Sequence, residues 1–371
     1  MGKRGDWLGP MLMGTSALAA AVTLLSLSRR SHWIFRMGDF PRVQLAALAA
    51  ASGAAYAAFC SRNRPRDYIV MAADAAVVAW QLARIYTYTP LASPTVQRAA
   101  SDDADPDSRI VLMITNVQME NEHHERLLDL VAEVDPDVLL AVEVDDAWAR
   151  ALDRLADRYA YAVRHPRDNW YGMQLLSKLE LVEPQIEFLV QDDVPSLRTC
   201  LRLRSGVEVV LRGLHPRPPE PIRDQPSAPR DAELVAVGRD VGRNKDVPTI
   251  VAGDLNDVAW SDTSQLFVRL SGLLDPRAGR GFFNSYNAHS PLFRYPLDHV
   301  FHSRHFKLVR LERLRAIGSD HFPILIELQF DPHAAREQEE SHERPGDERR
   351  ADEKLEQEAE AAATNADRSR E

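Results

Sequence analysis

The chain is poor in cysteine, and its central part is poor in lysine; both shortages narrow the possible functions. Its 371 residues include two cysteines, Cys60 and Cys200, which are too few for the disulfide framework of a small secreted domain. Residues 108–330 carry 27 basic and 33 acidic side chains, a net charge of −6, and only three of the basic ones are lysines. A domain with this net negative charge is not expected to bind nucleic acid through a long series of basic side chains.

Long apolar runs are confined to the first 90 residues, where they occupy residues 11–27, 43–60 and 69–86. Each has 17 or 18 residues, near the lower limit for a helix that crosses a bilayer. Asp74 interrupts the third run, and a packed polar residue between helices is its simplest interpretation. A cleaved signal peptide is the alternative for the first run. The repeated pattern of an apolar run followed by arginines favours a membrane anchor of three transmembrane helices, residues 1–89.

The remaining chain divides into a linker, a domain and a tail. Residues 90–108 contain three prolines among small and polar residues, which predicts a linker. Residues 331–371 carry 7 basic and 14 acidic side chains and no aromatic residue, which predicts a charged tail that is disordered or at most transiently helical. Residues 109–330 alternate β-rich apolar runs with segments of helical periodicity. This alternation predicts an α/β (α+β) domain, a four-layer αββα sandwich of two packed sheets.

The periodicity also places the individual elements of this domain. Helices are expected at residues 124–134, at residues 145–155 and around Leu234, Val237 and Val241. Strands are expected at residues 110–114, 138–142, 173–176, 197–203, 207–214, 249–252, 297–301 and 324–330.

Unusual polar residues fall at the ends of these expected strands. An Asn or Asp at a strand end usually caps a turn, so each one alone has a structural explanation. Six such positions without a lysine are hard to obtain from turns alone. Carboxylate and amide oxygens suit a hard cation such as Mg²⁺ or Mn²⁺, and histidines with carboxylate partners suit phosphoryl chemistry. The residues are Asn116, Glu143, His215, Asp254 with Asn256, Asp298, and Asp320 with His321.

Together with their neighbours, these residues resemble the motifs of the endonuclease/exonuclease/phosphatase superfamily in a deoxyribonuclease-like arrangement. The resemblance covers roughly residues 108–330 and implies a Mg²⁺- or Mn²⁺-dependent hydrolase of phosphodiester or phosphomonoester bonds. The apolar runs ahead of the domain resemble a membrane-anchored bacterial branch. That branch implies a multi-pass protein of the bacterial inner membrane with an extracytoplasmic catalytic domain. The motifs are Asn116, Glu143, Gly172 with Leu175-Leu176-Ser177, Gly213-Leu214-His215-Pro216, Gly253-Asp254-Leu255-Asn256, Leu297-Asp298-His299-Val300 and Gly318-Ser319-Asp320-His321-Phe322-Pro323.

The resemblance implies a role for each residue that matches a motif. Glu143 would be the main metal ligand, with Asn116 near the metal or its waters and Asp320 helping to hold it. Asp254 would orient or deprotonate the attacking water. Asn256 would donate a hydrogen bond to a phosphate oxygen.

The two histidines are expected to differ. Asp298 would fix His321 through one ring nitrogen and leave the other to act on the phosphate, while His215 would contact a second phosphate oxygen. In the deoxyribonuclease branch a glutamate near residues 170–177 supports the first histidine. This chain has no glutamate there, so either Asn169 substitutes for it or His215 is supported by another group. Arg217 is expected either to clamp a phosphate or to be an ordinary surface arginine.

The sequence leaves the substrate open. Prevalence within the superfamily narrowly favours nucleic acid, whereas the membrane anchor favours a phospholipid or sphingolipid headgroup. A catalytically inactive membrane scaffold or sensor is the alternative from another class, but no metal or water-positioning residue is missing. Three helices with one carboxylate show no repeat or broken helix, so a transporter is discounted. No protein partner is inferred.

Overall fold

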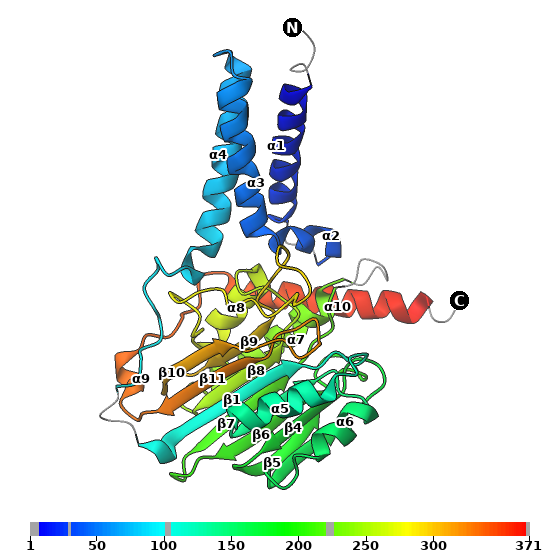
Figure 1. Ribbon diagram of the computed structural model, residues 1–371, viewed down its shortest axis with the longest axis vertical. Coiled ribbons are helices and arrows are strands. Elements are labelled where there is room, and N and C mark those ends of the chain that lie inside the picture. The colour runs from blue at the N-terminus through cyan, green and yellow to red at the C-terminus, as the bar shows by residue number, and fades with distance from the viewer. Residues whose placement is uncertain (1–6, 29–30, 101–104, 220–225, 369–371) are drawn as a thin grey trace.

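The computed structural model describes residues 7–28, 31–100, 105–219 and 226–368 (Figure 1). The helices are α1 (Leu8–Leu25), α2 (Trp33–Arg36), α3 (Arg42–Phe59), α4 (Pro65–Ile85), α5 (His124–Val134), α6 (Asp146–Asp153), α7 (Ala228–Arg243), α8 (Asp262–Ser271), α9 (Ala334–Glu337) and α10 (Asp347–Arg368), with the 3-10 helices η1 (Met37–Asp39), η2 (Tyr86–Tyr88) and η3 (Pro106–Ser108). The strands are β1 (Arg109–Asn116), β2 (Val138–Val142), β3 (Tyr161–His165), β4 (Met173–Ser177), β5 (Glu180–Glu187), β6 (Ser196–Arg202), β7 (Glu208–Leu214), β8 (Thr249–Asp254), β9 (Asp298–His302), β10 (Phe306–Arg313) and β11 (Ile324–Phe330). Parts of the predicted anchor (1–6 and 29–30), linker (101–104) and tail (369–371) lie outside the described residues.

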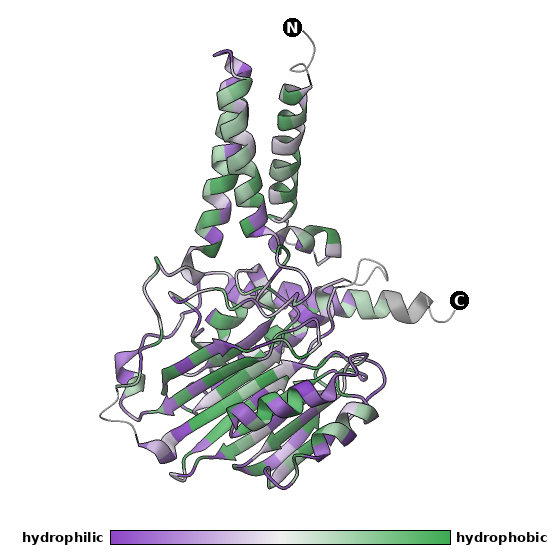
Figure 2. Cartoon of the chain, in the orientation of Figure 1, coloured by the Kyte–Doolittle hydropathy of each residue, from purple (hydrophilic) through white to green (hydrophobic). Residues whose placement is uncertain are grey.

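The three expected apolar segments form helices α1, α3 and α4, which project together from the α/β domain (Figure 1). Among the described helices, two are long and apolar enough to cross a membrane, Leu8–Leu25 and Pro65–Tyr88. Three clearly transmembrane helices are therefore not confirmed. The reason is that half of α3 is alanine, which is only weakly apolar, and that the helix carries Arg42 and Gln44 in its first turn. Figure 2 shows apolar residues along most of the bundle, with hydrophilic residues mainly near its ends.

The domain consists of two mixed sheets packed together with helices, which confirms the predicted α/β sandwich. The strand orders are β10-β11-β1-β2-β4-β3 and β5-β6-β7-β8-β9. Successive side chains of a strand point to opposite faces of its sheet. Ile110 and Leu112 of β1 therefore join the core between the sheets, while Met113 packs with α5 and α6. In the same way Ile250 of β8 faces the other sheet, and Val251 packs with α7 and α8.

Strands β3, β5 and β10 were not expected from the sequence, and each lies at the edge of its sheet. Their residues are largely half-buried or exposed, because an edge strand has a neighbour on one side only. Such strands lack the continuous apolar run that marks a central strand such as β2, in which all five residues are buried. Edge position therefore explains what the sequence pattern missed.

The C-terminal tail was expected to be disordered or at most transiently helical, but the structure folds α9 and α10 within it. Helix α10 lies across α7 and α8 (Figure 1) and buries Ala351 fully against them. Helix α10 forms ion pairs with the domain: Lys354 lies 2.7 Å from Asp231, and Asp347 lies 2.6 Å from Arg269. Composition alone cannot reveal such pairs, because the partners come from helices about 80 to 120 residues earlier in the chain.

The predicted linker lies along the domain where the structure describes it, instead of serving as a free spacer. Val96 is buried in the core between the sheets. The main-chain nitrogen of Leu308 donates to the carbonyl of Gln97 (2.8 Å), and that of Ala99 donates to the carbonyl of Leu308 (3.0 Å). The segment is thus held beside β10.

Hydrogen bonds also hold the helical bundle against the domain. The ring nitrogen of Trp260 donates to the carbonyl of Asp39 (2.7 Å), and Arg84 donates to the carbonyl of Trp260 (2.9 Å). The hydroxyl of Tyr88 donates to the carbonyl of Ala259 (2.9 Å). These contacts give the bundle one orientation relative to the sheets.

Candidate active site

The polar residues expected at strand ends come together because of the sheet topology. Strands β1 and β2 are parallel, as are β7 and β8, so the carboxyl ends of each pair lie at the same edge. Asn116 and Glu143 come from the first pair, and Asp254 comes from β8. The antiparallel strand β9 adds Asp298, which is the register partner of Asp254. His321 arrives from the loop before β11.

Asn116 connects carboxylates from the two sheets. Its amide nitrogen donates to Oε1 of Glu143 (2.7 Å) and to Oδ2 of Asp254 (3.0 Å). Its amide oxygen accepts a hydrogen bond from the main-chain nitrogen of Gln118 (2.9 Å). In this arrangement Asn116 orients the two acids, and its oxygen is occupied by the main chain.

His321 lies between two carboxylates. Its Nδ1 is 2.7 Å from Oδ2 of Asp298, and its Nε2 is 3.6 Å from Oδ2 of Asp254. Burial by itself lowers the pKa of His321, but the charge of Asp298, together with those of Asp254 and Asp320, raises this pKa to about 10. At neutral pH the ring is therefore a cation and can donate a proton from Nε2.

His215 has a different environment. Its Nε2 lies 3.9 Å from Oε1 of Glu143 and 3.9 Å from Oδ2 of Asp254. Its Nδ1 is buried and has no hydrogen-bond partner among the described residues. Asn169, the expected substitute for the missing glutamate, bonds to main-chain atoms instead. Burial lowers the pKa of His215 to about 4, so this ring is neutral at pH 7.

Three acids at the site are costly to keep charged. Burial raises the pKa of Glu143 to about 7 and also raises the pKa values of Asp254 and Asp320. All three line one cavity. A divalent cation would offset their mutual repulsion, and oxygen donors of this type suit Mg²⁺ or Mn²⁺.

The position of such a cation depends on which ligand atoms are not already engaged in hydrogen bonds. Among the described residues, Asp254, Asp298 and His321 have potential ligand atoms within 4.8 Å of one another. However, Nδ1 of His321 is already bonded to Asp298, so this group is a hydrogen-bonded triad. The carboxylates of Glu143 and Asp320 have no histidine partner within hydrogen-bond distance, and they suit a hard cation better.

Two motif glycines permit close approaches that the site requires. Gly253 has a φ of +141°, and a Cβ there would lie 2.0 Å from the carbonyl oxygen of Leu214. Gly318 has a φ of +102°, and a Cβ there would lie 2.6 Å from the side chain of Asn121. Any other residue would push β7 from β8, or the last loop from its neighbour. The motif glycines therefore allow the close packing that brings the acids beside them into the site.

Two adjoining cavities open from these residues. The smaller, of about 310 Å³, is lined by His215, Arg217 and neighbouring side chains. The larger, of about 510 Å³, is lined by Asp254, Asp320 and His321 on one side and by apolar residues on the other. Glu143 and Asn256 line both cavities. Glu143 therefore lies where the two cavities meet, and Asp254 and Asp320 line the larger one.

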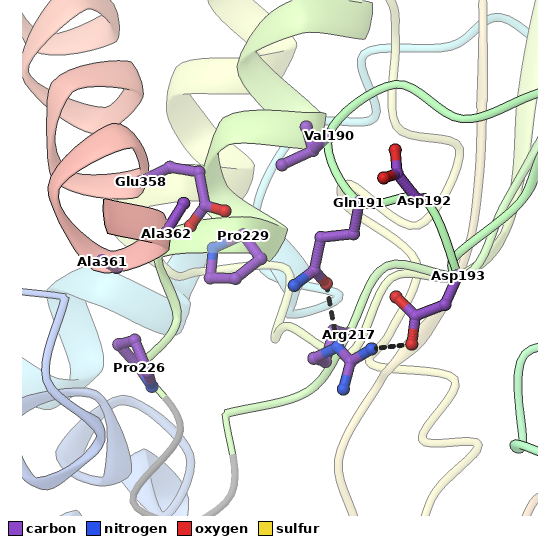
Figure 3. A pocket seen from close by; sticks show the side chains of 10 residues that line it. All are labelled: Val190, Gln191, Asp192, Asp193, Arg217, Pro226, Pro229, Glu358, Ala361 and Ala362. Carbon is purple, nitrogen blue, oxygen red and sulfur yellow. Dashed lines mark hydrogen bonds and ion pairs between the residues drawn. The ribbon is translucent and has the colours of Figure 1, made fainter. Parts of the chain in front are cut away.

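Arg217 lines both the smaller cavity and a third one of about 470 Å³, which Figure 3 shows. It donates to Gln191 (2.8 Å) and to Asp193 (2.6 Å), and its guanidinium carbon lies 4.9 Å from the ring centroid of Tyr171. Glu358 of α10 lines the third cavity opposite Arg217 (Figure 3). Arg217 is thus a paired, partly buried side chain, and the third cavity contains none of the expected metal or histidine positions.

Several residues that shape the site were not assigned a role from the sequence. The side-chain oxygen of Gln118 accepts a hydrogen bond from the main-chain nitrogen of Asp320 (2.9 Å), and the hydroxyl of Ser319 donates to the carbonyl of Asn116 (2.8 Å). These bonds hold the last motif against β1. The sequence signal that could have revealed them is their position within or next to a motif. The aromatic rings beside the two histidines are Tyr171 and Tyr286.

Fold and site together define a phosphoesterase-type α/β sandwich, in which acids and histidines gather at the ends of two packed sheets. The chain belongs to the endonuclease/exonuclease/phosphatase family, because the sequence pattern of the Endonuclease/Exonuclease/phosphatase family matches residues 113–321, more than half of its 371 residues. Members of this family hydrolyse phosphoric esters. No curated protein matches this chain by sequence.

Solved structures share the fold of the domain. The D. rerio TDP2 complexed with single strand DNA product is 17% identical, with a TM-score of 0.50 over 60% of this chain and 99% of that one. The endonuclease/exonuclease/phosphatase from Beutenbergia cavernae DSM 12333 is 17% identical, with a TM-score of 0.49 over 60% of this chain and 72% of that one. The human Nocturnin catalytic domain with bound sulfate anion is 18% identical, with a TM-score of 0.46 over 60% and 95%. At such identities the likeness is one of fold alone.

Proposed function

We propose that the protein is a membrane-anchored hydrolase of phosphoester bonds that depends on a divalent cation, Mg²⁺ or Mn²⁺. One observation carries the proposal: Asn116 joins Glu143 to Asp254, and Asp254 in turn lies 3.6 Å from Nε2 of His321. A candidate metal ligand, an acid able to activate water and a cationic donor therefore face one space. Hydrolysis of an anionic ester needs these three functions.

Glu143 and Asp320 are the proposed ligands of the cation, with Asn116 orienting Glu143. When bound, the cation would neutralise charge on the phosphate and make its phosphorus easier to attack. Asp254 is the proposed base, which orients the attacking water and accepts its proton. Burial raises the pKa of Asp254, and a carboxylate with a raised pKa is a better proton acceptor.

The remaining residues bind the phosphate. His321, fixed by Asp298, donates Nε2–H to a non-bridging oxygen as negative charge develops there. Asn256 and the neutral His215 line the adjoining cavity and contact the other oxygens. Arg217 stands further along that cavity and would meet the part of a larger substrate beyond the reacting phosphate.

The anchor would place this site at a membrane surface. Helix α3 packs against both α1 and α4, so less of its alanine-rich surface needs to face lipid. Three helices with the N-terminus inside would put the domain outside the bacterial inner membrane, as the resemblance to the membrane-bound branch implies. Nucleic acid is the second candidate substrate, since the similar TDP2 structure contains a single-strand DNA product.

The test uses the purified full chain and methyl 4-nitrophenyl phosphate, a small diester. Chelation should abolish hydrolysis, and Mg²⁺ or Mn²⁺ should restore it. Glu122→Gln is the matched control for Glu143→Gln, because Glu122 is an exposed acid that follows β1 but lies outside the cluster. Full activity in chelator would contradict the metal requirement, and loss of activity in the control would contradict the assignment of the acids.

A further inference from the structure

The larger cavity at the site has an apolar side that the membrane anchor supplies. The segment between α1 and α3 contributes Trp33, Met37, Phe40 and Pro41, which we call the anchor wall. The acids and His321 line the same cavity, so one space of about 510 Å³ joins an anion-binding end to an apolar surface. The loop before β9 adds Tyr286, Phe293, Tyr295 and Leu297.

The anchor wall lies at the base of the helical bundle, because α2 and η1 connect α1 to α3 (Figure 1). Large apolar side chains are exposed here: Met37 is 53% exposed, Phe293 55% and Leu292 71%. Gln44 of α3 donates to the carbonyl of Leu292 (2.6 Å), so the loop before β9 lies against the bundle. An exposed apolar rim of this kind is typical of a surface that contacts a membrane.

The anchor wall has a fixed position beside the catalytic residues. Phe40 packs edge-on against Tyr295, with 5.5 Å between ring centroids, and Trp260 donates to the carbonyl of Asp39 in the adjoining turn. The described part of the linker is also hydrogen-bonded to β10. These contacts hold the site next to the bundle and favour a substrate that lies at the same surface.

The charges of the cavity select against a polyanion. Among the described residues that line the cavity, Arg36 is the single basic side chain apart from the histidine, and it is buried beside Asp39 at 3.5 Å. A nucleic-acid strand requires a series of basic side chains along its path, whereas this cavity offers acids and apolar groups. An amphiphile with one phosphate and an apolar chain matches both the polar end and the apolar end of the cavity.

We infer that the substrate is a membrane phospholipid, whose phosphodiester lies at Asp254 and His321 and whose apolar chain lies along the anchor wall. This inference rests on the proposed phosphoesterase function and specifies its substrate. In the reaction, water adds to phosphorus, one phosphorus–oxygen ester bond breaks, and the released alcohol carries away a proton. A phosphodiester and water become a phosphomonoester and an alcohol.

The experiment uses the full chain in maltoside micelles with Mg²⁺. Three substrates are compared: mixed phosphatidylcholine and phosphatidylglycerol, methyl 4-nitrophenyl phosphate, and a single-stranded oligonucleotide. Phosphorus NMR follows conversion of diester to monoester. The measured quantity is the ratio of kcat/KM for the lipid to kcat/KM for the methyl ester. This ratio is compared between the wild type and the variants, because the 4-nitrophenolate leaving group makes the methyl ester intrinsically more reactive than a lipid.

Met37→Glu should lower the ratio of the lipid rate to the methyl ester rate by about tenfold or more, because it puts a charge on the wall. Phe293→Ser tests the same cavity from a different element. The matched control is Ile34→Glu: Ile34 is also exposed and also on this segment, but it does not line the cavity. Its ratio should stay at the wild-type value.

Three results would overturn the inference: an unchanged ratio in both cavity variants, an equal fall in Ile34→Glu, or cleavage of the oligonucleotide or methyl ester without cleavage of lipid. Cleavage of none of the three substrates would instead contradict the proposed hydrolase function. The two failures are therefore distinguishable.

Discussion

Asp298→Asn would test whether His321 acts as a cation. The substitution keeps the size of the side chain and an acceptor for Nδ1, but removes the negative charge that lies 2.7 Å from the ring. His321 is 4% exposed, and burial alone favours its neutral form. Asp298 is the largest of the charges that oppose burial.

The structure sets the size of the expected effect. The rise in the pKa of His321 from the ordinary 6.5 to about 10 corresponds to about 5 kcal/mol in favour of the charged ring. Asp254 and Asp320 contribute less than Asp298 to this rise. Loss of the Asp298 charge therefore lowers the pKa of His321, and burial then favours the neutral ring. We expect a rate loss of about 10²- to 10⁴-fold at weakly alkaline pH, the range for loss of a positioned proton donor.

The assay measures hydrolysis of methyl 4-nitrophenyl phosphate by the wild type and Asp298→Asn from weakly acidic to weakly alkaline pH. Because the variant has the lower histidine pKa, its rate relative to the wild type should fall as the pH rises. Activity should partly return at acidic pH, where the ring is protonated again. A ratio that is independent of pH, or a fully active variant, would refute the role of the Asp298–His321 pair.

The other predictions concern the metal ligand, the two histidines, a buried acid and the topology. Glu143→Gln should slow hydrolysis at least about 10²-fold, because charge at a metal site contributes several kcal/mol; an unimpaired rate would remove Glu143 from the site. His321→Ala should harm the rate more than His215→Ala, and the reverse order in steady-state kinetics would show that the dominant histidine is misassigned. Glu233 is buried, accepts from Ser196 (2.6 Å) and has its pKa raised by burial from 4.5 to about 7. The native state thus keeps a proton that the unfolded chain releases, so stability should fall, by at most about 3 kcal/mol, as the pH rises from 4.5 to 7. Glu233→Gln should remove this dependence in urea unfolding, and parallel pH curves for the two proteins would disprove it. Finally, a reporter fused to the C-terminus should be active outside the cytoplasm; activity confined to the cytoplasm would reverse the topology.

The central elements of the fold could be predicted because their burial leaves a pattern in the sequence. β2 and α5 have the expected limits, Val138–Val142 and His124–Val134. β2 is buried along its whole length, and one face of α5 packs on the first sheet. The edge strands and α10 left no such pattern. Their burial depends on neighbours elsewhere in the chain, such as Asp231 for Lys354.

The polar side chains that the structure brings together could be named from the sequence, because residue type and position at a strand end are visible there. Asp298 and His321 could be paired from motifs, but their 2.7 Å contact depends on how β9 and the loop before β11 are placed. Asn116, expected near the metal, bonds to two acids from different sheets. The anchor wall was not visible in the sequence, since its residues lie far from every motif.

The sequence by itself determined which chemical groups the protein has: carboxylates, amides and imidazoles at strand ends, together with apolar N-terminal segments. Only the tertiary structure decided the state of those groups. His215 and His321 are chemically the same side chain, with an ordinary pKa of 6.5, yet the pKa is about 4 for one and about 10 for the other. The reason is that protonation depends on desolvation and on the distance to other charges. Both quantities are set by the packing of strands and helices that the chain brings together from distant positions.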